Sequence, residues 1–134
     1  MKEVVAIIRM NKMNKTKEAL VDAGFPAFTA TKVMGRGRKA LDQDLVSAIE
    51  ENPEDGLDAL SMVAQGPRLL PKRMLKLVVP DEAVATVVET IIKANQTNHP
   101  GDGKIFVLPV TDVVRVRTEE TGELAIDEMK IARG

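Results

Sequence analysis

The chain has 134 residues, a length that corresponds to one domain with a modest hydrophobic core. Apolar residues make up 44% and charged residues 29%, as in ordinary soluble globular proteins, and the formal net charge is −1. This charge argues against the broad basic surface of nucleic-acid-binding proteins, although a local basic patch is compatible with it. With no cysteine and one histidine, His99, the chain has no disulfide, no thiolate cluster and too few ligands for a typical zinc site.

No apolar stretch is long enough to span a membrane, and the N-terminal MKEVVAII leads directly into a strand-like run. A signal peptide would have a basic start, a longer apolar core and a cleavage site. We therefore expect a cytoplasmic protein without direct membrane insertion. Its only aromatic residues are three Phe, which is few for the stacking surfaces of RNA-binding sheets.

The first half of the chain has a strand, a helix and a second strand. Val4–Ile8 is a β-branched apolar run, typical of a strand. Residues 14–23 are good helix formers, with Asn14 available as a cap and Gly24 directly after the end. Residues 27–34, AFTATKVM, alternate in the period of two that predicts another strand.

The second half repeats this order. Residues 74–79, MLKLVV, predict a strand that Pro80 ends. The next helix has Asp81 as a plausible N-cap, apolar residues at helical spacing and an end at Asn95. Residues 104–110 predict a fourth strand, and residues 113–117 predict its continuation.

The β-α-β, β-α-β order predicts an α+β, ferredoxin-like split βαβ fold (βαββαβ). Its antiparallel sheet carries both helices on one face, with a long loop between the second and third strands. That loop, residues 35–72, exceeds the usual length of a loop in a compact domain. We interpret it as a mobile segment that contacts a partner; the alternative is an insertion without function.

Two glycine-containing stretches and an arginine pair are candidates for an anion site. Gly35–Lys39 (GRGRK) follows the second predicted strand, and Gly101–Lys104 (GDGK) precedes the fourth. Glycines let backbone amides close on an anion, and the basic side chains supply positive charge. Arg115 and Arg117 fall on one face of the last predicted strand, where a phosphate between them would relieve their repulsion.

Each feature also has an ordinary explanation. A GxGK-like stretch is usually only a turn, and paired arginines usually face solvent or pair with nearby acids such as Glu119 and Glu120. Neither stretch has the spacing of a P-loop. Their joint occurrence at strand ends of one small sheet favours a phosphate-bearing ligand. No nucleophile and base form a catalytic group, so the sequence favours binding over catalysis.

The same motifs closely resemble a known family. TNHPGDGKIFVLPV at 97–110, followed by VVRVRT at 113–118, resembles the C-terminal signature of the PII signal-transduction proteins. TxTxVxGxGR at 29–38, LPK at 70–72 and MLKLVVPD at 74–81 are similar to the family as well. The resemblance covers nearly the whole chain outside 39–69. It implies a regulatory binding protein and not an enzyme, with at most a slow incidental ATPase activity.

The resemblance implies a trimer with ATP or ADP in the clefts between subunits. On one side of the cleft it assigns to the nucleotide Thr29, Gly35, Gly37, Arg38, Thr97, Gly101, Asp102, Gly103 and Lys104. Arg115 and Arg117 would reach the phosphates from the neighbouring subunit. Lys72 matches the lysine that meets 2-oxoglutarate, which binds with Mg²⁺ and ATP, so the metal is held through ATP. Residues 36–72 of a single domain, 1–134, would be the T-loop that carries the ligand state to a target protein.

The chain departs from the common family pattern in three ways. Lys39 replaces a glutamine that usually helps to hold Mg²⁺ and 2-oxoglutarate, which leaves Lys39 and Lys72 as the predicted 2-oxoglutarate residues. Lys76 stands where an acid is common. The loop is long and lacks tyrosine, so tyrosine uridylylation is excluded. These traits resemble the longer-looped second member of the NifI-type nitrogen-fixation branch.

Resemblance to that branch implies a homotrimer, or a hetero-oligomer with a sister PII protein. It also implies that the protein inhibits dinitrogenase and is released by 2-oxoglutarate with ATP. Two alternatives stay open: a PII regulator of an ammonium transporter or biosynthetic enzyme, and a ferredoxin-like RNA-binding domain. Low aromatic content and slight negative charge argue against the RNA-binding domain.

Overall fold

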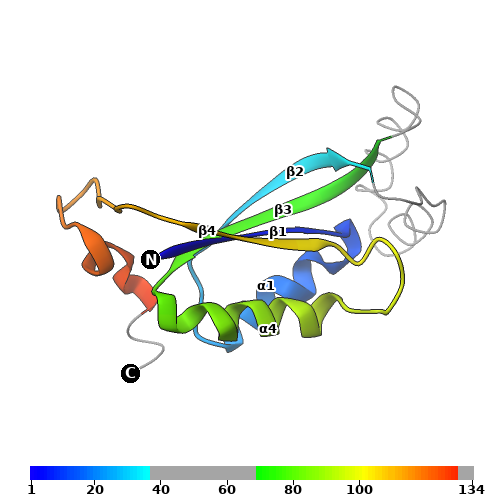
Figure 1. Ribbon diagram of the computed structural model, residues 1–134, viewed down its shortest axis with the longest axis horizontal. Coiled ribbons are helices and arrows are strands. Elements are labelled where there is room, and N and C mark those ends of the chain that lie inside the picture. The colour runs from blue at the N-terminus through cyan, green and yellow to red at the C-terminus, as the bar shows by residue number, and fades with distance from the viewer. Residues whose placement is uncertain (37–68, 130–134) are drawn as a thin grey trace.

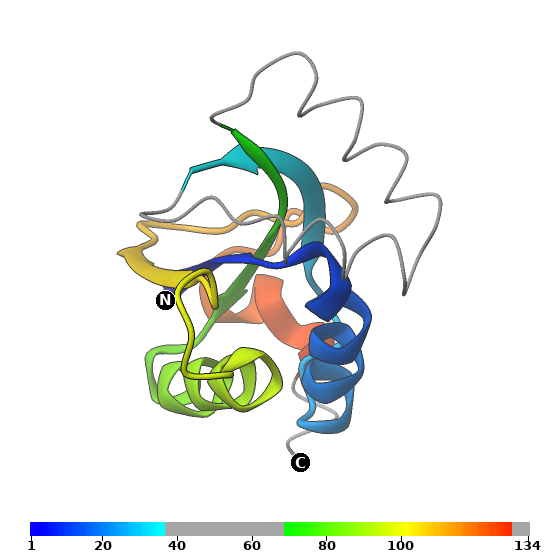
Figure 2. The ribbon, with the colours of Figure 1, turned by 90° about the vertical axis from the view of Figure 1, so that its right-hand side faces the viewer.

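The computed structural model describes residues 1–36 and 69–129, and its elements follow the predicted order (Figure 1). One antiparallel sheet contains β1 (Lys2–Ile8), β2 (Thr29–Gly35), β3 (Leu70–Val79) and β4 (Lys104–Pro109), in the order β2-β3-β1-β4. Two helices, α1 (Met13–Asp22) and α4 (Val84–Asn95), cover one face of this sheet (Figures 1 and 2). The predicted ferredoxin-like split βαβ fold is confirmed.

The core lies between the helices and the face of the sheet that they cover. Alternate residues of the two central strands point into it, as a strand period of two requires. The side chains that are almost wholly buried there include Val4, Ala6, Ile8, Leu75, Leu77, Val79, Leu20, Val87 and Ile91. Burying each large apolar side chain contributes roughly 1.5–3 kcal/mol, so this face fixes the sheet against the helices.

The end of α1 follows the prediction, whereas the start of α4 does not. Gly24 adopts a left-handed φ of 94°, and the amide of Phe25 donates to the carbonyl of Leu20 at 2.8 Å, closing a Schellman motif. Asp81 was expected to cap α4, but it begins a short 3-10 turn, η2 (Asp81–Ala83), without a side-chain cap. Its carboxylate instead lies 2.9 Å from the amino nitrogen of Met1.

β3 begins four residues earlier than the predicted start at Met74. Pro71 and the charged pair after it argue against a strand, because proline donates no hydrogen bond and is rare in central strands. Here β1 pairs with β3 only as far as Arg73, so Pro71 pairs only with Met34 of the edge strand β2. As a consequence, Lys72 is a strand residue with a defined position beside Val33.

The prediction of a strand at residues 113–117 is wrong. Only an isolated bridge forms there, between Val114 and Thr121. The chain turns back because the amide of Glu119 donates to the carbonyl of Arg115 at 2.8 Å, and Glu119 adopts a φ of 62°. A 3-10 helix, η3 (Gly122–Met129), follows. A period of two therefore does not govern how Arg115 and Arg117 are oriented.

Residues 37–68, most of the predicted long loop at 35–72, lie outside the described residues. In residues 1–36 and 69–129, no helix is long and apolar enough to cross a membrane.

Candidate functional site

Strand register brings several predicted site residues to one end of the sheet. Gly35, the last residue of β2, pairs with Leu70 of β3, and a Cβ built on Gly35 would lie 3.7 Å from Cγ of Lys72. On the other side of β1, Lys104 begins β4 opposite Ile7. We call this end of the sheet, with the turn at residues 97–104, the turn site. Gly37, Arg38 and Lys39 were predicted to belong here, and they lie outside the described residues.

The turn before β4 requires glycine for a steric reason. Gly101 and Gly103 adopt φ values of 97° and 120°, which side-chain-bearing residues rarely reach. A Cβ on Gly103 would also meet the carbonyl oxygen of Ile7 at 2.2 Å. The second glycine of GDGK is therefore fixed by the close approach of the turn to β1.

The side chain of Asp102 organises the same turn. One carboxylate oxygen accepts from the amides of Thr97 at 2.7 Å and Asn98 at 2.9 Å. The other accepts from the hydroxyl of Thr97 and from Nη1 of Arg9, at 2.6 Å. Four donors occupy the acceptor sites of the carboxylate, so the side chain of Asp102 holds the turn instead of presenting itself to a ligand.

This network also sets the charge of Asp102. Partial burial acts to raise the pKa of its carboxyl. Hydrogen bonds from the hydroxyl and amide of Thr97, from Arg9 and from the amide of Asn98 outweigh burial and hold the pKa well below its usual range. Asp102 is therefore ionised at neutral pH, as the ion pair with Arg9 requires.

Arg9 belongs to the turn site but was not predicted from the sequence. It follows β1 directly, 93 positions before Asp102, and donates from Nη2 to the carbonyl of Pro100 at 2.9 Å. No local motif marks an isolated arginine after a strand. Only the antiparallel pairing of β1 with β4 brings Arg9 beside the turn.

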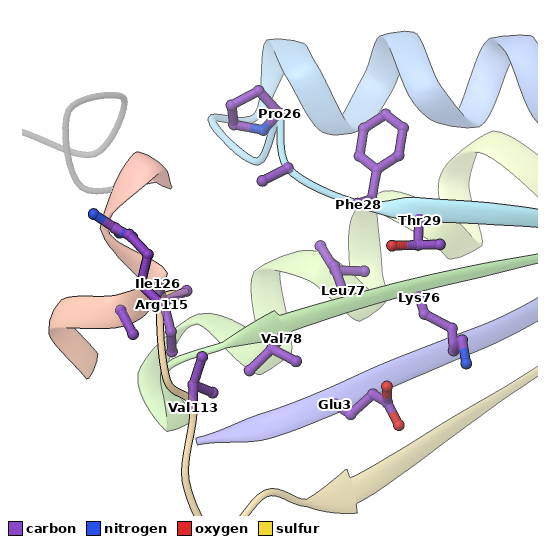
Figure 3. Close-up of a pocket in the computed structure, with 12 residues that line it drawn as sticks. Glu3, Pro26, Phe28, Thr29, Lys76, Leu77, Val78, Val113, Arg115 and Ile126 are labelled. Atoms are coloured by element: carbon purple, nitrogen blue, oxygen red, sulfur yellow. The ribbon is translucent and has the colours of Figure 1, made fainter. Parts of the chain in front are cut away.

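A second group of residues lines a cavity of about 690 Å³ away from the turn site (Figure 3). Its apolar wall includes Phe28, Val78, Val113 and Ile126, and its polar groups are Glu3, Thr29, Lys76 and Arg115. We call it the base cavity because it lies at the base of β2, where this strand begins. The side chains of Glu3 and Lys76 line this cavity and form no ion pair or side-chain hydrogen bond with another described residue.

Arg115 and Arg117 differ in their surroundings. Arg115 lies 3.1 Å from Oε1 of Glu120 and also donates to the carbonyl of Leu124 at 3.3 Å. The ordinary explanation of an arginine paired with a nearby acid therefore applies to Arg115. Arg117 is exposed and forms no ion pair with the described residues.

The two groups are separated within one chain. Thr29 pairs with Lys76 at one end of β2, and Gly35 lies at the other end. Six residues of extended strand span about 20 Å. Thr29 was expected on the same side of a cleft as Gly35 and Lys104. Within one chain, Thr29 instead lines the base cavity together with Arg115.

The structure therefore belongs to the class of ferredoxin-like split βαβ proteins, with basic residues both at the turn site and in the base cavity. Residues 1–120 match the family model described as Nitrogen regulatory protein P-II. The chain is 38% identical to Nitrogen regulatory protein P-II 1 of Escherichia coli, over 94% of its own length and all of that relative's. It belongs to the PII family of nitrogen regulatory proteins.

Two further relatives point to the nitrogen-fixation branch. The chain is 52% identical to the nitrogen fixation nifHD region GlnB-like protein 2 of Methanobacterium ivanovii, covering 94% of this chain and 99% of that protein. It is 47% identical to the protein of the same description from Methanococcus maripaludis, covering 94% and 100%. The predicted resemblance to second members of the NifI-type branch is confirmed.

A solved structure agrees with the fold. The crystal structure of Arabidopsis thaliana PII bound to citrate superposes with a TM-score of 0.68 at 31% identity, covering 93% of this chain and 88% of that one.

Proposed function

We propose that this protein senses ATP or ADP together with 2-oxoglutarate and regulates nitrogen fixation by binding a target, dinitrogenase. The observation that carries the proposal is that the predicted site residues lie at two separate places in one chain. The turn site has Lys104, Lys72 and the glycine turn, and the base cavity has Thr29 and Arg115. Neither group alone surrounds a nucleotide.

The turn site suits the phosphates. The turn has two glycines with positive φ, which leave its backbone bare of side chains, and it ends at the exposed ammonium group of Lys104. Lys72 adds a second cation from β3. Mg²⁺, which neutralises adjacent phosphate oxygens, would arrive with ATP and be held through it.

The base cavity suits the adenosine part. Its walls combine apolar side chains with the Thr29 hydroxyl, which both donates and accepts hydrogen bonds. Its volume of about 690 Å³ is within the usual range of small-molecule sites. Arg115 and the exposed Arg117 would approach the phosphates from this side.

The two groups would meet between neighbouring subunits of a homotrimer, or of a hetero-oligomer with a sister PII protein. The face of the sheet opposite the helices supports such an assembly. Phe106 and Leu108 of β4 pair with Val5 and Glu3 on that face and are 50% and 42% exposed. Val116, beyond the sheet, is 95% exposed. Covering these exposed apolar side chains with a second copy of the chain would remove them from water and stabilise the assembly.

A carboxylate effector is consistent with the lysines of the turn site. Arabidopsis PII binds citrate, a tricarboxylate, and 2-oxoglutarate is a dicarboxylate. Lys72, with Lys39 from the T-loop, would pair with its carboxylates. The T-loop, about residues 36–72, would then present a different surface to dinitrogenase when 2-oxoglutarate is bound.

Calorimetry and a pull-down test this function together. We expect ATP to bind the purified protein, 2-oxoglutarate to bind only with Mg²⁺ and ATP, and 2-oxoglutarate to release dinitrogenase from immobilised protein. Absence of ATP binding would contradict the sensor role. Retention of dinitrogenase at saturating 2-oxoglutarate and ATP would contradict the regulatory scheme.

A further inference from the structure

Arg9 connects two parts of the chain that are far apart in sequence. It lies between β1 and the short 3-10 turn η1 (Met10–Lys12), and its guanidinium reaches the turn before β4. Nη1 lies 2.6 Å from Oδ1 of Asp102 and 3.4 Å from the hydroxyl of Thr97, and Nη2 lies 2.9 Å from the carbonyl of Pro100. The side chain of Arg9 is only 12% exposed, so water screens this ion pair less than a surface pair.

On the side that faces α4, packing contributes little to holding the turn. A cavity of about 370 Å³ lies between the apolar side of α4, including Val88 and Ile92, and residues 102–105. Packing against α4 is therefore incomplete beneath the turn. Its glycines add backbone freedom that costs entropy when the turn is ordered.

We propose that Arg9 is a positioning residue for ligand binding: it fixes the Thr97–Lys104 turn through Asp102 and Pro100 before a nucleotide arrives. This role rests on the proposed nucleotide site and adds a residue to it. Asp102 orders the amides of Thr97 and Asn98, and Arg9 fixes Asp102 relative to β1. A turn that is already ordered binds its ligand without the entropy cost of ordering.

Arginine suits this role better than lysine. The planar guanidinium donates to a carboxylate and a carbonyl at once in a fixed geometry, whereas an ammonium group is a point charge on a flexible stem. We therefore expect Arg9→Lys to keep the charge but lose part of the order of the turn. Arg9→Met removes both.

A double-mutant cycle separates positioning from direct contact with the ligand. The variants are Arg9→Met, Asp102→Asn and the pair together, with Lys15→Met, which removes an exposed cation of α1, as the matched control. Calorimetry measures ATP affinity, and hydrogen exchange measures the amides of Thr97 and Asn98 without nucleotide. We expect Arg9→Met to weaken ATP binding and accelerate this exchange, each about tenfold, and Lys15→Met to change neither.

Because Arg9 acts largely through Asp102, Arg9→Met should have a smaller effect once Asp102 is Asn, where its bond to the Pro100 carbonyl remains. An undiminished loss of ATP affinity in the Asp102→Asn background would overturn the proposal, because Arg9 would then act independently of Asp102. Unchanged exchange at Thr97 and Asn98 in Arg9→Met would overturn it as well. Exchange is measured without nucleotide, so it tests Arg9 even if the wild-type protein binds no ATP, a result that contradicts only the proposed function.

Discussion

Asn95 at the end of α4 donates a hydrogen bond from its side-chain amide to the hydroxyl of Thr16 in α1, at 2.9 Å. Both side chains are buried, and Thr16 in turn donates to the carbonyl of Lys12 at 2.7 Å. Asn95 also donates to the carbonyl of Ile91 at 2.9 Å. This polar contact ties the two helices together close to the turn that begins at Thr97.

The Thr16–Asn95 contact predicts a loss of stability when one partner is removed. Thr16→Val leaves an amide proton of Asn95 buried without an acceptor and should cost about 1–3 kcal/mol of unfolding free energy. Urea denaturation measures the change. Thr90→Val is the matched control, because the Thr90 hydroxyl also bonds a helix carbonyl but near the surface, and it should cost less than about 0.5 kcal/mol. Equal losses in both variants would contradict the role of burial.

Gly103→Ala should destabilise the protein by more than about 2 kcal/mol, because the new methyl group meets the carbonyl of Ile7 and the backbone φ is unfavourable. Gly122→Ala separates these two causes. Gly122 has a φ of 67° but no atom within 4 Å of a built Cβ, so backbone strain alone should cost about 1 kcal/mol. Thermal unfolding ranks the variants, and a smaller loss for Gly103→Ala than for Gly122→Ala would contradict the geometry.

Asp102 should make stability depend on pH in the acid range. Its pKa in the folded protein is below the unfolded value of about 3.9, so its contribution is fully present above that pH. The contribution decreases as pH falls from about 4 towards the folded-state pKa. Asp102→Asn should therefore differ from wild type more at pH 7 than at pH 3 in urea denaturation. Glu89→Gln, on the exposed side of α4, is the control. An Asp102→Asn difference that is the same at both pH values would contradict the prediction.

Lys72→Ala should weaken 2-oxoglutarate binding while the protein stays folded and keeps most of its ATP affinity. Lys72 lies beside Gly35 at the turn site, where its ammonium can pair with a carboxylate. Calorimetry with 2-oxoglutarate in the presence of Mg²⁺ and ATP measures the loss. Lys93→Ala removes an exposed cation of α4 and should leave 2-oxoglutarate binding unchanged. Equal affinity of wild type and Lys72→Ala would remove Lys72 from the effector site.

The fold was predictable because strong periodic signals determine it. Local conformational preference and tertiary packing favour the same structure in the apolar run of β1, in the helical spacing of α4 and at Gly24 after α1. The early start of β3 was not predictable, because the edge position that tolerates Pro71 depends on how far β1 extends.

The candidate site was predictable only where the residues that build it are neighbours in the sequence. GDGK marks the turn, but Arg9 reaches it across 93 positions through strand pairing, which no local pattern reports. The expected strand at residues 113–117 failed because backbone hydrogen bonds of Arg115 with Glu119 and with Glu120 form a turn in its place. An alternation of valine and arginine does not distinguish a strand from such a turn.

Mixing two inactive variants tests most directly whether the nucleotide site forms between subunits. Lys104→Ala disables the turn-site half, and Arg117→Ala disables the half beside the base cavity, so each variant alone should bind no ATP. After the subunits are dissociated and reassembled together, each mixed trimer contains one interface with an intact lysine from one subunit and an intact arginine from its neighbour. Calorimetry should then detect ATP binding in the mixture. A mixture of confirmed mixed trimers that binds no ATP would contradict a site shared between subunits.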